Sequence, residues 1–146
     1  MESIPVSLKL TTESNERGQK DIITIKEEGH CYQAPNRMIL RFIEHQDGGE
    51  DIQTTVTIQE NRVAIRRTGP VQMHQVFVPK QWTENTYHHP YGLFYMQTKT
   101  DHIEHQFSPK TEKGRLFITY LLRLNQEEEQ EKRQRLTLTY QRRQTQ

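Results

Sequence analysis

The sequence contains a single cysteine among its 146 residues, so no disulfide bond can form within the chain. It also lacks a run of about 18 apolar residues, which a membrane-spanning helix needs. Its first part does not resemble a secretory signal, because Pro5 and Lys9 interrupt the only apolar run there. These absences predict a cytoplasmic protein without membrane contact. Cys31 is interpreted as a small, half-buried side chain rather than a redox centre.

Charge of one sign is also missing, since 20 basic and 19 acidic residues leave a formal net charge of +1. A chain so nearly neutral has no long-range field to steer it toward nucleic acid or an anionic membrane. A stacking and electrostatic surface for single-stranded nucleic acid would use Arg62, Arg66, Tyr95, Lys99 and Arg115. The net charge argues against that partner.

Motifs of the common enzyme classes are absent too: there is no G-x-S-x-G elbow, no H-E-x-x-H run and no Walker loop. The carboxylates Glu44, Glu84 and Asp101 have no partner at sequence level for acid–base chemistry. Neighbouring histidines on strands point to opposite faces and do not converge on a metal, which applies to His88, His89, His102 and His105. The sequence therefore predicts no enzyme, no metal site and no cofactor.

Sustained helical periodicity is the last absence, and apolar residues instead alternate with polar ones. A sheet with one buried face needs only every second residue to be apolar. Alternation thus reconciles a folded chain with only 32% hydrophobic residues and a mean hydropathy of −0.98. The clearest alternating set is Leu116, Ile118, Tyr120, Leu122 and Leu124.

Turn signals divide the alternating segments into eight to ten strands, for example at residues 15–18 and 47–49. Gly29 is expected to mark a bulge or a bend in a closed sheet, and the acidic residues 127–129 a solvated hairpin tip. Short turns leave no room for crossover helices. We therefore predict one domain over residues 1–146, an all-β, antiparallel up-and-down barrel.

A resemblance to a known family lies in three strings. They are residues 67–69 (RTG), residues 71–75 (VQMHQ), and residues 90–92 (PYG) followed by Phe94, Met96 and residues 98–100 (TKT). Together they resemble the signature of the uncharacterised bacterial YwiB family, over nearly the whole chain. The resemblance implies a small calycin-type, lipocalin-like β-barrel without an established activity, and it supplies no site residues.

Arg67 is the most informative single position, because it shares strand parity with Val63 and Ile65 and should point into the barrel. A buried arginine needs a partner. One interpretation is a structural salt bridge or hydrogen-bonded plug, with Tyr91, Gln75 or Glu44 as partner. Another is recognition of a carboxylate or phosphate by its rigid fork of donors. A third is a bulge that turns Arg67 outward and leaves Arg66 inside.

Two alternating runs, residues 71–77 and 94–100, are expected to face the same interior. A small barrel has room for side chains or for one small ligand. The functional hypothesis is therefore an amphipathic or anionic small molecule bound inside the barrel, contacting Arg67, Met73, Gln75, Phe77, Phe94, Met96 and Thr98. The alternative is a non-enzymatic protein-interaction domain with a side-chain-filled barrel, whose outer surface or sheet edge meets a protein partner.

Overall fold

The computed structural model describes residues 3–125 and 131–144, and every regular element within them is a β-strand. No helix long and apolar enough to cross a membrane occurs in these residues. The strands are β1 (Ser3–Glu16), β2 (Gln19–Ala34), β3 (Arg37–Glu44), β4 (Ile52–Gln59), β5 (Arg62–Thr68), β6 (Met73–Phe77), β7 (Trp82–His89), β8 (Gly92–Ser108), β9 (Lys113–Leu124) and β10 (Glu131–Arg142). The acidic residues 127–129 lie outside the described residues, so their place at a hairpin tip stays a prediction.

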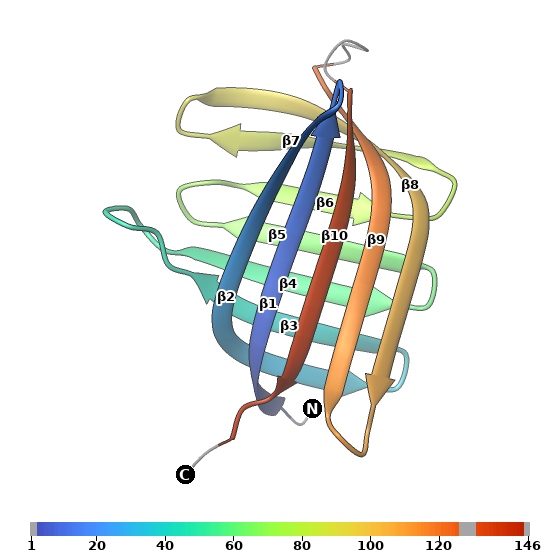
Figure 1. Ribbon diagram of the computed structural model, residues 1–146. Coiled ribbons are helices and arrows are strands. Elements are labelled where there is room, and N and C mark those ends of the chain that lie inside the picture. Colours follow the sequence, from blue (N-terminus) through green and yellow to red (C-terminus); the bar gives the residue numbers. More distant parts are fainter. Residues whose placement is uncertain (1–2, 126–130, 145–146) are drawn as a thin grey trace.

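All ten strands belong to one antiparallel sheet that nearly closes on itself (Figure 1). Successive strands are neighbours, and the first strand also pairs with the last, with Val6 opposite Arg142. Between β6 and β7 there is no continuous ladder, and an isolated bridge from Gln72 to His88 joins the two sides. This seam apart, the chain is an antiparallel up-and-down barrel, which confirms the predicted architecture.

Two long strands carry the sheet round its corners. In Figure 1, β1, β9 and β10 run steeply across the front, β3 to β7 run across behind them, and β2 and β8 bend from one layer into the other. The corner of β2 is Gly29, where a Cβ atom would lie 2.2 Å from the carbonyl oxygen of Arg41. In β8 the register shifts between Thr100 and His102, as a bulge requires. Figure 1 shows that β2 bends, and the close approach of the Arg41 backbone at Gly29 agrees with the bend expected there.

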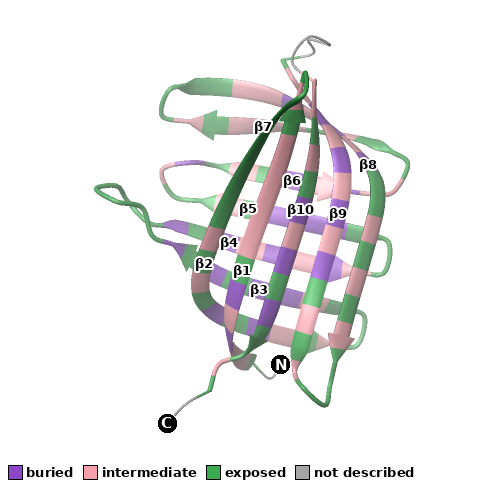
Figure 2. Cartoon of the chain, in the orientation of Figure 1, coloured by how far each residue is buried: buried purple, intermediate pink, exposed green. Residues whose placement is uncertain are grey.

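Inward-facing side chains of both layers form one hydrophobic core. On β9, Leu116 and Ile118 are fully buried while the residues between and beside them are not, so alternation decides which face is inside (Figure 2). Across the barrel, the ring of Phe77 meets Tyr120 edge-on, with 4.9 Å between ring centroids. Burying each such side chain contributes about 1.5–3 kcal/mol. The interior is therefore packed with side chains.

Two of the turns use positive φ, a backbone conformation that glycine adopts more readily than other residues. Arg17 and Gly18 both have positive φ, 51° and 83°, which is the two-residue hairpin turn that matches strand twist. Gly69, between β5 and β6, has a φ of 130°, and a Cβ atom there would lie 2.8 Å from the carbonyl oxygen of Asp51. These turns join β1 to β2 and β5 to β6, and their role in setting strand register stays a prediction.

The predicted strand over residues 71–77 begins later than expected. The ladder starts at Met73, and Val71 lies in the bend before it, although its side chain is buried. Gly69 and Pro70 lie in the same bend, so the alternation in the sequence begins before the ladder with β5 does. The second run was placed correctly, since residues 94–100 all lie within β8.

Candidate functional site

Arg67 lies on β5 directly opposite the buried Thr54 of β4, so it does face the interior. Its guanidinium holds the carboxylate of Glu44, at the end of β3, through Nε to Oε2 at 3.0 Å and Nη2 to Oε1 at 2.9 Å. The hydroxyl of Thr54 donates to the same carboxylate. Glu44 is only 6% exposed. The donor fork of Arg67 is thus occupied by one of the three partners that the sequence suggested.

Gln75 and Thr98 come together across the seam. The amide Nε2 of Gln75, on β6, donates to the hydroxyl of Thr98, on β8, at 2.9 Å, and both side chains are buried. Beside them, the hydroxyl of Thr83, on β7, donates to the carbonyl oxygen of Val76 at 2.5 Å. These polar groups take the place of the missing ladder between β6 and β7, and they do not converge with Arg67 on one hydrogen-bonded group.

The four predicted apolar contacts divide by depth. Phe77 and Met96 are part of the packed core, with 0% and 5% exposed. Met73 and Phe94 are partly buried nearer the surface, and Phe94 meets the ring of Tyr87 at 6.2 Å between centroids. The seven predicted ligand contacts therefore contribute to packing and to internal hydrogen bonds in this structure, and two other features of the surface are open to a ligand or partner.

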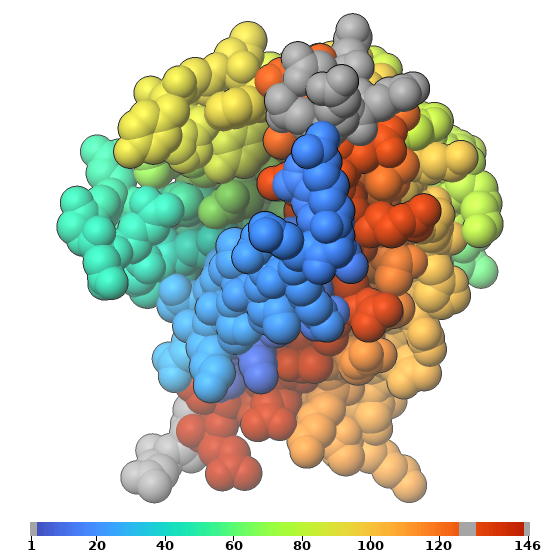
Figure 3. Space-filling view, turned by 45° about the horizontal axis from the view of Figure 1, so that its top comes forward, coloured from blue at the N-terminus to red at the C-terminus, as the bar shows by residue number. Residues whose placement is uncertain are grey.

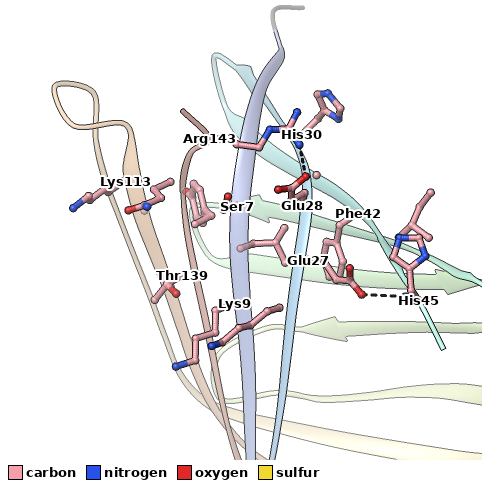
Figure 4. Close-up of a pocket in the computed structure, with 17 residues that line it drawn as sticks. Ser7, Lys9, Glu27, Glu28, His30, Phe42, His45, Lys113, Thr139 and Arg143 are labelled. Atoms are coloured by element: carbon pink, nitrogen blue, oxygen red, sulfur yellow. Dashed lines mark hydrogen bonds and ion pairs between the residues drawn. The ribbon is translucent and has the colours of Figure 1, made fainter. Parts of the chain in front are cut away.

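The first feature is a groove of about 1020 Å³ across β2, β1 and β10, with the end of β3 at its side. Figure 4 shows Lys9 and Thr139 on one side of β1, and Glu27 and His45 on the other. Hairpin register places Lys9 directly opposite Lys26. Like charges opposite one another on a sheet are destabilising, so an anion bound there would stabilise the pair.

Carboxylates in this groove have other partners. Glu28 accepts from Nη1 of Arg143 at 2.5 Å, and Glu27 accepts from the backbone N–H of His45 at 3.0 Å. Neither Lys9 nor Lys26 forms an ion pair with a described residue. The groove thus carries local positive charge in a chain that is nearly neutral overall.

The second feature is a free edge on β2. Residues 19–28 pair with β1 on one side, and β3 pairs with β2 only from Gly29 onward. Ile22 and Ile23 lie in this segment with 57% and 64% exposed, one on each face of the strand. Figure 2 shows this half of β2 almost entirely exposed. In the space-filling view, the β1–β2 hairpin stands as a blue ridge on the surface (Figure 3).

Cys31 is buried more deeply than expected, with 1% exposed. Burial raises the pKa of its thiol to about 11, so the thiol stays protonated at neutral pH. The absence of thiolate agrees with the interpretation of Cys31 as a packing residue. Among the described residues there is no group of three or more His, Cys, Asp and Glu side chains that could hold a metal ion.

Comparison with known proteins places this barrel in a family. Residues 8–138 match the family described as "Domain of unknown function (DUF1934)". The chain belongs to this family. A DUF1934 relative is the "Uncharacterized beta-barrel protein YwiB" of Bacillus subtilis (strain 168), 29% identical over 136 residues, which are 93% of this chain and 92% of YwiB. The resemblance to the YwiB family is therefore confirmed.

A solved structure supports the same architecture for this DUF1934 chain. The "Crystal structure of ywiB protein from Bacillus subtilis" matches it with a TM-score of 0.84 at 26% identity, over 97% of this chain and 94% of that one. The YwiB barrel and the barrel described here thus share their overall course.

Sequence reasoning missed the groove and the free edge of this DUF1934 chain, although both left signals. Counting outward from the two-residue turn at Arg17 and Gly18 sets Lys9 opposite Lys26. Gly29 is where β2 turns from one neighbour to two, so the ten residues before it form the free edge. The sequence does not show that β3 pairs with β2 only from Gly29 onward, because that depends on the pairing of separate segments.

Proposed function

We propose that this chain is a non-enzymatic interaction domain, acting in the cytoplasm, that receives an extended segment of a protein partner along the free edge of β2. The observation that carries the proposal is the one-sided pairing of residues 19–28, a stretch in which Ile22 and Ile23 are exposed. An exposed edge offers a row of backbone donors and acceptors to which another strand can pair.

The direction of the free groups follows from the pairing of β1. The backbone N–H of Arg143 donates to the carbonyl oxygen of Pro5. The backbone N–H and C=O groups of odd-numbered residues of β1 therefore point toward β10, and those of even-numbered residues point toward β2. The residue numbers of two paired residues on β1 and β2 always add up to 35, so each even-numbered residue of β1 lies opposite an odd-numbered residue of β2. The odd-numbered residues of β2 therefore form the backbone hydrogen bonds to β1. The N–H and C=O groups of Ile22, Thr24 and Lys26 therefore point to the open side.

Packing of the interior supports the same choice over a ligand inside the barrel. Phe77 and Met96 are enclosed by the core, and Arg67 is held by Glu44. A ligand there would have to displace a buried ion pair as well as packed side chains, which costs several kcal/mol.

The test is selection of random extended peptides on this protein, followed by exchange measurements on the bound state. We expect amide exchange to slow at Ile22, Thr24 and Lys26 when a selected peptide binds. Thr24→Pro removes an outward N–H and keeps the backbone bonds to β1, losing on that side only the side-chain contact of Thr24 Oγ1 with Thr11 Oγ1 at 3.5 Å, so it should abolish binding and keep the melting temperature within about 5 °C. Thr24→Val keeps the N–H and should bind normally. Binding that survives Thr24→Pro would refute the edge as the site.

The groove favours a second candidate function, binding of a small anionic ligand outside the barrel. Its support is the Lys9 and Lys26 pair, opposite each other with no carboxylate partner among the described residues. Pyrophosphate titrated into the protein should shift the resonances of Lys9, Lys26 and Thr139. The double variant Lys9→Ala/Lys26→Ala should lose the response, and Lys99→Ala, whose lysine lies over the ring of Trp82, should keep it. Equal responses of all variants would exclude the groove.

A further inference from the structure

We propose that the segment on the β2 edge is β2 of a second copy of this chain, antiparallel to the first about a two-fold axis at Thr24. This inference rests on the proposed function, since it names the occupant of that same edge. It makes β2 the centre of one sheet that continues through two barrels, with β1 and β10 of each copy on either side.

Backbone geometry limits the register of such a pair. In an antiparallel ladder, residues whose N–H and C=O groups point outward must lie opposite residues of the same kind. On β2 these are the even-numbered residues from Lys20 to Glu28. The residue numbers of two opposite residues in the two copies therefore add up to an even number. The two-fold axis then passes through a residue and not between two residues.

Side chains distinguish the registers that remain. With the axis at Thr24, Lys20 lies opposite Glu28 of the second copy, and Ile23 opposite Ile25 of the second copy. With the axis at Ile23, Lys20 would lie opposite Lys26, a like-charge pair. With the axis at Ile25, Ile23 would lie opposite a carboxylate. Only the Thr24 register combines opposite charges with an apolar pair.

The apolar pair explains the exposed Ile23. This side chain lies on the same face of the sheet as Ile25 and as the buried Leu8 and Val6 of the neighbouring strand β1. Ile23 therefore continues the core-facing side of the sheet beyond the barrel. Ile23 is 64% exposed in the single chain. Contact with Ile25 of the second copy removes both from water at two symmetric places.

The Thr24 register has one unfavourable contact, which makes it testable. Asp21 lies opposite Glu27 of the second copy, and the two carboxylates repel each other. Asp21→Lys replaces two symmetric repulsions with two attractions, and we expect it to tighten the dimer about fivefold or more. In the register with its axis at Ile23, Asp21 would face Ile25, and the same substitution would have no such effect.

Disulfide trapping reads the register directly, because Cys31 is the only native cysteine and is buried. Two copies of Thr24 on the axis are a hydrogen-bonded pair with Cα atoms about 5.5 Å apart, within disulfide range. Thr24→Cys should therefore form a covalent dimer on mild oxidation. Lys26→Cys is the matched control on the same face, because its two copies lie four residues, about 13 Å, apart along the strands. Crosslinking by Lys26→Cys but not by Thr24→Cys would overturn the register.

Sedimentation of the native chain from micromolar to millimolar concentration completes the test. We expect a monomer–dimer equilibrium that Thr24→Pro abolishes and Thr24→Val preserves. A dimer that persists in Thr24→Pro, or a native chain that stays monomeric at all concentrations, overturns the second copy as occupant. In the monomeric case, peptides that bind in a manner sensitive to Thr24→Pro would leave the proposed function standing, whereas their absence would remove it as well.

Discussion

Replacing Arg67 by methionine is the sharpest test of the ion pair inside the barrel. The substitution removes the charge and both hydrogen bonds to Glu44 and keeps much of the side-chain volume. Glu44 then stays buried with the hydroxyl of Thr54 as its remaining side-chain donor. A structural arginine predicts a large loss of stability, because a buried carboxylate loses its counter-charge.

The size of the loss follows from the burial of the pair. Removing one partner of a buried pair costs about 3–5 kcal/mol. The Arg67 side chain is 23% exposed and that of Glu44 only 8%, so water reaches the pair in part and the lower value, about 3 kcal/mol, applies. For a chain of this length each kcal/mol lowers the melting temperature by about 2–4 °C. Calorimetry should therefore show a melting temperature about 6–12 °C lower. Urea unfolding should show a free energy of unfolding about 3 kcal/mol lower.

A double variant separates the lost charge from the lost packing. Glu44→Gln/Arg67→Met keeps an amide oxygen to accept from Thr54 but contains no buried charge. Its free energy of unfolding should exceed that of Arg67→Met by at least about 1 kcal/mol. If Arg67→Met melts within about 2 °C of the native protein, or if the double variant recovers nothing, the structural role assigned to Arg67 is wrong and a recognition role regains support.

Two further predictions concern pH and backbone conformation. Burial lowers the pKa of His105 below its usual 6.5, so the unfolded chain takes up the proton more readily, and stability should fall as pH falls below about 6.5. His105→Gln should reduce this slope; an unchanged slope would contradict the assignment. Gly69→Val should cost more than about 1 kcal/mol, since φ is 130° and Asp51 is close. Gly48→Val, also at positive φ but in open space, should cost less in the same urea titration, and unchanged melting of Gly69→Val would make that turn an ordinary loop.

Alternation predicted most of the fold because the apolar residues of each strand show which of its faces is buried. Leu116 and Ile118 are buried and their neighbours are not, and this holds whatever strand lies alongside. The inward direction of Arg67 followed from the same parity. Its choice of Glu44 did not, because that contact joins residues 23 positions apart and depends on the registers of β3, β4 and β5 together.

The surface features depended on information of another kind. Ile22 and Ile23 are both apolar, so the sequence signals a strand at this point but no preferred face. Ile22 faces outward, whereas Ile23, on the core-facing side, is exposed because β3 does not continue along β2 before Gly29. Similarly, the ligand hypothesis assumed that Gln75 and Thr98 would be free to bind, whereas their pairing across the seam satisfies both.

The closure of the barrel by its first and last strands has a consequence for how the chain folds. The β1–β2 hairpin can form as soon as the first 34 or so residues exist, but β1 cannot complete its other side until β10 is made, since Val6 pairs with Arg142. Contacts between such distant residues are slow to form, so β1 has an open side during synthesis of the whole chain.

Because residues 5 and 143 are hydrogen-bonded neighbours, a short linker between the native ends, with new ends placed in residues 45–51, would turn the slow closing pair into a local hairpin. Such a permuted chain should refold faster than the native one to the same barrel.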